Sequence, residues 1–280
     1  MIEVLRPGAL TTIQDRGRIG WAHLGVPRSG ALDAPALARA NAIVGNDEDA
    51  AGLEITLTGC TLRFRSSATV AVTGAAAAVT VDGEVRGISF LVQSGETVRI
   101  GPARGGVRTY LAVSGGIDVE PVLGSRSCDT LSGIGPAALK AGDMLPLGPA
   151  TNHGSRMPTE PDEAEEARLS IRFGPRDDWF VRGAGEVLCG SSYTMTVQSN
   201  RVGARLAGEP IRRARAGELP SEGIALGSVQ ITPDGMPIVF LADHPTTGGY
   251  PVIGVVDAAA VASLAQVRPG SSVRFHGSQC

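Results

Sequence analysis

Residues 219–256 read LPSEGIALGSVQITPDGMPIVFLADHPTTGGYPVIGVV, and this stretch combines the clearest strand pattern of the chain with its densest polar loop. Residues 228–232 alternate apolar and polar side chains, which is typical of a half-buried strand. A Pro-Asp-Gly turn at 233–235 then leads into a second apolar run at 238–242, and a third run follows at 252–256. Two such runs joined by a tight turn predict a β-hairpin, so the stretch indicates antiparallel β structure.

A polar loop at residues 244–251 connects the second and third runs. The loop follows Asp243, which ends the second predicted strand, and it carries two threonine hydroxyls and two glycines. Glycine lets a ligand approach the backbone closely, and a loop anchored on rigid strands keeps its side chains in place. The loop is therefore the first candidate for ligand contact.

The composition favours a globular, turn-rich, mainly β protein with a few short helices. Among 280 residues there are 38 glycines and 18 prolines, too many for a helical bundle, while 42% of the residues are hydrophobic. A net charge of -3 gives no argument for binding nucleic acid or a membrane surface. The N-terminus does not resemble a signal peptide, and no apolar run approaches membrane-spanning length, so we expect a cytoplasmic protein.

A change of composition predicts two β-rich lobes. Residues 150–168 are rich in proline and acidic residues, which is typical of a solvated linker or an exposed excursion. This segment separates an N-terminal lobe at 1–149 from a C-terminal lobe at 169–280 that contains the hairpin and the polar loop. Asp33 and Asp257 each precede a helical pattern and are expected to cap it.

The scarcity of lysine excludes several kinds of chemistry. Lys140 is the only lysine among 25 lysine and arginine residues, and it does not lie in a Gly-Lys-Ser/Thr phosphate loop or in a biotin-attachment sequence. Any nucleotide-binding or biotin-carrying part must therefore come from another chain. The four cysteines are far apart and show neither a zinc-site spacing nor a disulfide framework, so no metal site is predicted.

No nucleophile and base pair is evident, since there is no Gly-x-Ser-x-Gly motif and the four histidines lie at unrelated positions. What remains is a set of polar residues at predicted strand ends, and such a set fits a small polar amide substrate. The acid–base candidates are Asp15, Glu54, Glu222 and Asp243. The substrate-binding candidates are Gln14, Arg18, Ser29, Arg126, Asn200, Arg201, Gln230, Thr246, Thr247, Gly248, Gly249 and Tyr250.

Turns and strand ladders use the same residue types, so we expect several of these candidates to be structural. Glu54, in an otherwise apolar segment, is either a paired structural carboxylate or a site residue facing a barrel mouth. A β-barrel commonly gathers its ligand groups at the loops around one mouth. We therefore expect Asp243 and the loop after it to face the same cleft as residues 14–18.

Motifs along nearly the whole chain resemble one known family. They are TTIQDRGR at 11–18, GVPRSGALD at 25–33, YLAVSGG at 110–116, LGSR at 123–126, SNR at 199–201, SEG at 221–223, GSVQ at 227–230, DGMPI at 234–238 and TTGGYP at 246–251. Together they resemble the signature of the allophanate hydrolase subunit 2 family. That family includes KipA-type proteins, the C subunit of 5-oxoprolinase and the carboxyltransferase domain of urea carboxylase.

The resemblance implies a cyclophilin-like β-barrel architecture and a subunit 1 partner, of the type of KipI or of the 5-oxoprolinase B subunit. It leaves three roles open: part of an ATP-dependent amide hydrolase, a biotin-dependent carboxyltransferase component, or a KipA-type regulator that binds a kinase inhibitor. We expect the first, because this chain carries no biotin-carrier motif. On this expectation ATP acts at the level of the complex, the substrate is a small cyclic or urea-like amide, and the chain alone is inactive.

Overall fold

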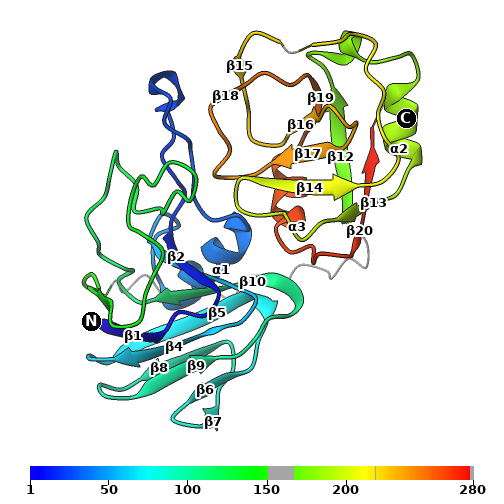
Figure 1. The fold of residues 1–280 in the computed structure, drawn as a ribbon. Helices are drawn as coiled ribbons and strands as arrows, with labels where there is room; N and C mark the ends of the chain where they lie inside the picture. Colours follow the sequence, from blue (N-terminus) through cyan, green and yellow to red (C-terminus); the bar gives the residue numbers. More distant parts are fainter. Residues whose placement is uncertain (151–166, 218, 278–280) are drawn as a thin grey trace. The chain divides into compact units, whose positions relative to one another are not determined.

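The computed structural model describes residues 1–150, 167–217 and 219–277. The chain divides into two compact units, and Figure 1 shows the fold of each. Unit 1 contains Met1–Arg18 and Ser29–Pro161, and unit 2 contains Ile19–Arg28 and Asp162–Cys280. The predicted linker at 150–168 lies almost entirely outside the described residues.

Unit 1 is built from two antiparallel sheets with the strand orders β11-β1-β4-β9-β6-β7 and β2-β3-β10-β5-β8 (Figure 1). The first contains β1 (Ile2–Arg6), β4 (Cys60–Phe64), β6 (Val79–Val81), β7 (Glu84–Val85), β9 (Thr97–Ile100) and β11 (Met144–Leu145). The second contains β2 (Leu10–Gln14), β3 (Gly52–Thr56), β5 (Ala68–Ala76), β8 (Ser89–Val92) and β10 (Arg104–Val113). Alternate side chains of both sheets, such as Leu62 and Leu111, form one apolar core.

The helix α1 (Ala34–Val44) packs on the five-stranded sheet, where Ala40, Ile43 and Val44 contact residues of β5 and β10. Asp33 caps this helix as predicted, because its Oδ1 accepts a hydrogen bond from Ala36 N at 3.0 Å. Gly45 ends it with a φ of 75°, a left-handed conformation that glycine adopts at little cost. The local sequence therefore fixes both ends of the helix.

Unit 2 is a closed barrel with the strand order β12-β19-β16-β17-β14-β13-β20, which confirms the expected mainly β architecture with a barrel (Figure 1). Its strands are β12 (Ala167–Phe173), β13 (Tyr193–Met195), β14 (Gly203–Ala207), β16 (Ser228–Ile231), β17 (Pro237–Phe240), β19 (Val252–Val256) and β20 (Ser272–His276). A separate two-stranded ribbon pairs β15 (Glu222–Gly223) with β18 (Thr247–Gly248). The remaining elements are α2 (Ala184–Gly190), α3 (Ala258–Leu264), η1 (Ala22–Leu24) and η2 (Asp177–Trp179).

The predicted hairpin is confirmed, since β16 pairs antiparallel with β17 and its other edge pairs with β19. Gly235 closes the turn by donating its N–H to Thr232 O at 2.9 Å. The second strand ends at Phe240, two residues before the end that the apolar run predicts. Beyond it the backbone turns toward the segment before β14, where Leu241 N donates to Val202 O and Asp243 N donates to Arg201 O.

The described residues also bear on the expectations for membrane-spanning helices, metal sites and cysteines. No helix of the described residues is long and apolar enough to span a membrane. In the same part of the chain, no group of three or more histidine, cysteine, aspartate or glutamate side chains is arranged to hold a metal ion. Among the described cysteines, Cys60 and Cys128 form no disulfide, whereas Cys189 is disulfide-bonded, which the wide spacing of the cysteines did not predict.

Candidate functional site

Asp15 lies directly after β2, and its buried carboxylate is a centre of hydrogen bonding. Its Oδ1 accepts hydrogen bonds from Gly17 N at 2.8 Å, from Ser125 Oγ at 2.7 Å and from Ser127 Oγ. Its Oδ2 accepts one from Arg126 N at 2.6 Å. Four donors from its own loop and from a loop about 110 residues later thus bond to one carboxylate, so Asp15 ties these loops together.

Gln14 and Arg18 flank Asp15, and both side chains are buried. Gln14 Nε2 donates to Cys128 O at 3.0 Å, and Arg18 donates from Nε to Val122 O at 3.2 Å and from Nη2 to Ser127 O. These bonds brace the backbone of residues 122–128. Gln14 Oε1 has no hydrogen-bond partner within the described residues, but Gln14 is 0% exposed and is closed to solvent in this conformation.

Glu54 has the contacts of a paired structural carboxylate. Its Oε2 accepts hydrogen bonds from Leu32 N at 3.0 Å and from Tyr110 Oη at 2.8 Å, and its Oε1 lies 3.4 Å from Arg108 Nε. Tyr110 Oη accepts in turn from Asp33 N at 2.8 Å. Burial, followed by the negative charge of Glu54, raises the pKa of Tyr110 well above its ordinary value. This network holds the residues that begin α1.

Ser29 and Arg126 also contact backbone and side chains of unit 1. Ser29 has a φ of 55°, unusual outside glycine, and its Oγ donates to Cys128 O at 2.8 Å. Arg126 donates from Nε to Val119 O and from Nη2 to Asp118 Oδ1, both at 2.7 Å. The structure thus gathers Gln14, Asp15, Arg18, Ser29 and Arg126 around the segment 118–128.

Arg201 and Asp243 form a buried ion pair in unit 2. Arg201 Nε lies 2.9 Å from Asp243 Oδ2, and Arg201 Nη2 lies 2.9 Å from Asp243 Oδ1. Their side chains are 2% and 0% exposed. A fork-to-fork pair of this kind fixes both side chains, and it joins the segment before β14 to the start of the polar loop.

Asn200 and Glu222 hold backbone segments elsewhere in unit 2. Asn200 Oδ1 accepts hydrogen bonds from Val202 N at 2.8 Å and from Gly203 N at 3.3 Å, which shapes the turn into β14. Glu222, in β15, accepts two hydrogen bonds from Arg176, one of them from Nε to Oε2 at 3.0 Å. The hydrogen bonds from Arg176 lower the pKa of the Glu222 carboxyl below its ordinary value. The side chains of Arg176 and Glu222 are 39% and 34% exposed, so solvent weakens this interaction.

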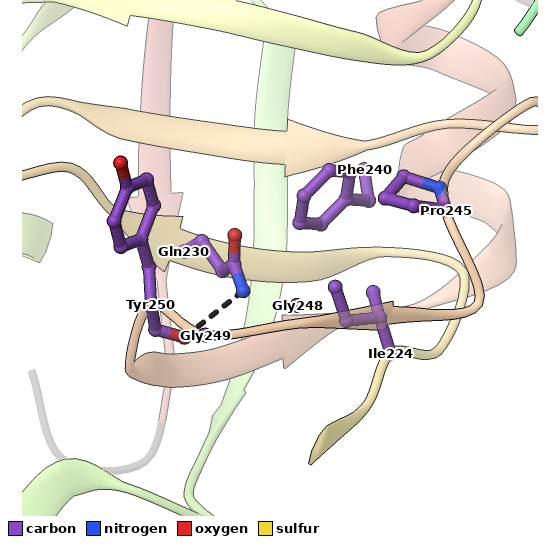
Figure 2. Close-up of a pocket in the computed structure, with 7 residues that line it drawn as sticks. All are labelled: Ile224, Gln230, Phe240, Pro245, Gly248, Gly249 and Tyr250. Atoms are coloured by element: carbon purple, nitrogen blue, oxygen red, sulfur yellow. Dashed lines mark hydrogen bonds between the residues drawn. The ribbon is translucent and has the colours of Figure 1, made fainter. Parts of the chain in front are cut away.

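A pocket of about 230 Å³ opens beside the polar loop of unit 2 (Figure 2). It is lined by Ile224, Gln230, Phe240, Pro245, Gly248, Gly249 and Tyr250. Gln230 comes from β16 and Phe240 ends β17, while Gly248 belongs to the β15–β18 ribbon. The hairpin and the loop that follow each other in sequence therefore build one concave site, lined by apolar side chains around a single amide.

Gln230 is bonded to the loop through one side of its amide. Gln230 Nε2 donates to Tyr250 O at 2.9 Å, which Figure 2 shows as a dashed line. The Arg213 guanidinium carbon lies 5.4 Å from the centre of the Tyr250 ring, and Arg213 Nη2 donates to Ile231 O. Arg213 thus supports both Tyr250 and the strand that carries Gln230.

Four of the predicted binding residues, Gln230, Gly248, Gly249 and Tyr250, line this pocket together. Thr247 lies in β18 and is exposed, while Thr246 precedes it and accepts at its backbone O from Ile224 N at 2.9 Å. Asp15 lies in unit 1 and Asp243 in unit 2, and their predicted common cleft stays a prediction.

Sequence reasoning missed the apolar lining residues Ile224, Phe240 and Pro245, together with Arg213. Apolar residues in a β-rich chain are indistinguishable from core residues by pattern. A usable signal was the position of Ile224 and Pro245, which directly adjoin motif residues of the polar loop and of the segment 221–223.

A family model for the carboxyltransferase domain, subdomain A and B, matches residues 24–277. The chain belongs to this carboxyltransferase-domain family. The match covers the pocket, the Arg201–Asp243 pair and most of unit 1, and it confirms the resemblance that the motifs indicate.

Individual proteins with similar sequences or structures also support membership of this family. The chain is 38% identical to the 5-oxoprolinase C subunit of Escherichia coli over 98% of this chain and 90% of that relative. It is 35% identical to urea amidolyase of Saccharomyces cerevisiae over 98% of this chain and 16% of that relative. Among solved structures, the K. lactis urea amidolyase matches with a TM-score of 0.91 at 30% identity, covering 98% of this chain and 18% of that one.

Proposed function

We propose that this chain is one component of an ATP-dependent amide hydrolase complex of the 5-oxoprolinase type. The observation that carries the proposal is the 38% identity to the 5-oxoprolinase C subunit, because it extends over 90% of that relative. The partner we propose is a subunit 1 protein, of the type of KipI or of the 5-oxoprolinase B subunit, and the substrate is a small cyclic or urea-like amide.

The unit 2 pocket supports a small amide as the substrate. Its lining offers one side-chain amide among apolar walls, which suits a compact ligand with one or two polar groups. The described lining contains no serine, cysteine or lysine that could act as a nucleophile. The pocket therefore binds and orients, while the activation of the amide falls to groups outside it.

The same pocket is a poor fit for a nucleoside triphosphate. Its volume of about 230 Å³ lies below the roughly 300–1,000 Å³ of pockets for drug-sized ligands, and no side chain of the described lining is cationic. Lys140, the single lysine, is exposed and belongs to an Ala-Leu-Lys-Ala-Gly sequence. We therefore assign ATP to the other components of the complex, and we assign no biotin to this chain.

A carboxyltransferase role is the second candidate, because the chain matches urea amidolyase over 98% of its own length and matches the carboxyltransferase-domain model. The same pocket would then take urea, and the carboxyl donor would come from a biotin carrier. This role predicts activity that depends on carboxybiotin and urea rather than on ATP and a lactam.

Reconstitution separates these candidates. The purified chain, alone and with the other subunits of a 5-oxoprolinase system, is assayed for glutamate and ADP formed from 5-oxoproline and ATP. We expect coupled product formation only in the presence of the partners. Carboxylation of urea by a supplied carboxybiotin carrier, with no cleavage of 5-oxoproline by the assembled subunits, would overturn the proposal and establish the second candidate.

A further inference from the structure

The side-chain amide of Gln230 is held in one orientation. Tyr250 O is a carbonyl oxygen and can only accept a hydrogen bond, so the atom that faces it at 2.9 Å must be Nε2. The other amide atom, Oε1, consequently points away from Tyr250 O, as Figure 2 shows. Gln230 thus presents an acceptor, and not a donor, to the pocket that it lines.

This acceptor is available to a ligand. Gln230 is only 4% exposed, and no donor within the described residues bonds to its Oε1. Because the described residues give Oε1 no donor, a ligand or a water molecule that enters the pocket can supply its hydrogen bond. The remaining lining residues offer no side-chain donor except the Tyr250 hydroxyl, so the missing donor has to come from what enters the pocket.

The walls restrict the ligand further. Ile224, Phe240 and Pro245 present apolar surface, and no side chain in the described lining carries a charge at neutral pH. An ionised group would lose its hydration there without a partner, so the part of the ligand that enters is neutral. A compact ring or chain with an N–H group meets all of these conditions.

We propose that the pocket is a binding site for a small, neutral secondary amide, and that the ligand's N–H donates its hydrogen bond to Gln230 Oε1. The choice of a lactam as the probe rests on the proposed function. In 5-oxoproline the amide edge of the ring enters the pocket, and the carboxylate stays outside it because the described lining offers no cationic side chain.

Gly248 lies close to two other residues that line the pocket, Ile224 and Gln230. A Cβ atom at position 248 would lie 2.5 Å from Ile224 Cδ1 and 3.1 Å from Gln230 Nε2, so an alanine there displaces the wall or the amide. Gly223, in the neighbouring strand of the same ribbon, has nothing within 4 Å of the place that a Cβ would occupy. Neither glycine has a positive φ, so alanine fits the backbone at both positions. The two positions therefore form a matched pair.

The test uses NMR titration of the isotope-labelled full chain with 2-pyrrolidinone, with its N-methyl derivative and with 5-oxoproline. We expect 2-pyrrolidinone and 5-oxoproline to shift the amide resonances of residues 248–250 and the side-chain NH2 of Gln230. The N-methyl compound has lost the N–H donor, so it should bind at least about tenfold more weakly. Equal binding of the two pyrrolidinones, or shifts confined to other residues, would overturn the proposal.

Substitutions sharpen the test. Gly248→Ala should weaken binding of 2-pyrrolidinone about tenfold or more, and Gly223→Ala should leave it unchanged. Gln230→Met keeps the length of the side chain but removes the acceptor, so the preference for the N–H compound should disappear. If Gln230→Met does not fold, the comparison of the two pyrrolidinones on the unaltered chain decides alone.

Failure of this inference is distinguishable from failure of the proposed function, because the titration needs neither ATP nor a partner. Cleavage of 5-oxoproline by the complex together with N–H-independent binding would overturn the Gln230 site alone. N–H-dependent binding without any cleavage by the complex would support the site and overturn the proposed hydrolase.

Discussion

Asp15 in unit 1 and Gln230 in unit 2 are both buried polar side chains at or near the end of a strand, but their hydrogen bonding differs. The Asp15 carboxylate accepts four hydrogen bonds from its own protein. Gln230 donates one bond to Tyr250 O and turns its oxygen toward a pocket. The contrast favours a structural role for Asp15 over the predicted catalytic one, and a ligand-binding role for Gln230.

The largest loss of stability is expected when the buried Arg201–Asp243 ion pair is broken. Asp243→Asn removes the carboxylate charge that faces the buried Arg201 guanidinium, so the free energy of unfolding should fall by about 3–5 kcal/mol in chemical denaturation. Replacing both residues, by Arg201→Met with Asp243→Leu, should destabilise less than the single change because neither charge is then buried. A catalytic Asp243 would instead lose about a hundredfold in turnover at nearly unchanged stability.

The next effect tests the saturated carboxylate itself. Asp15→Asn removes the charge that four donors share, and it should lower the free energy of unfolding by about 2–3 kcal/mol. Asp118→Asn on the segment that Asp15 contacts is the control, because the side chains of Arg126 and Asp118 are 33% and 52% exposed. That control should change stability by about 1 kcal/mol at most. An equal loss of unfolding free energy in Asp15→Asn and Asp118→Asn would contradict a structural role for the Asp15 carboxylate.

A smaller effect concerns the support of the pocket. Arg213→Gln removes the cation that stacks on Tyr250 and should weaken binding of 2-pyrrolidinone a few-fold, with a loss of stability of about 1 kcal/mol. Arg215→Gln is the matched control, since Arg215 stacks on Trp179 at 5.8 Å and is paired with Asp178. An unchanged affinity in Arg213→Gln, or an equal loss in Arg215→Gln, would show that Arg213 does not position the pocket.

The smallest effect is the pH dependence from Glu222. Its pKa is lowered in the folded protein by Arg176, so its contribution to stability is present above the ordinary pKa of a glutamate and is lost as the pH falls through the lowered value. Glu222→Gln should remove this part of the acid dependence of the thermal midpoint and change the midpoint at pH 7 only slightly. An unaltered acid dependence in the variant would contradict the pairing.

The sequence predicted the elements whose signals are local. The hairpin of β16 and β17 follows from alternation around a Pro-Asp-Gly turn, and the caps at Asp33 and Asp257 follow from single residues before apolar helical patterns. Each of these signals lies within a few residues of the structure that it specifies, and so each could be found without knowing the fold.

The roles of the site residues could not be predicted in this way, because they depend on distant partners. Asp15 bonds to Ser125 and Ser127, which only the folded sheets bring near it. The orientation of the Gln230 amide depends on a backbone oxygen 20 residues later in the chain. The polar residues predicted from the sequence therefore included both structural and ligand-binding residues, and the sequence alone could not tell them apart.

The contrast between the two side chains is tested most directly by the turnover of 5-oxoproline per folded complex, measured for Gln230→Met and Asp15→Asn side by side together with their stability. We predict that Gln230→Met loses about tenfold or more in kcat/KM while the chain stays folded. We also predict that Asp15→Asn is destabilised while its turnover per folded complex stays near that of the unaltered protein. The reverse pattern, with full activity in Gln230→Met and lost turnover in a stable Asp15→Asn, would contradict the assignment of both residues.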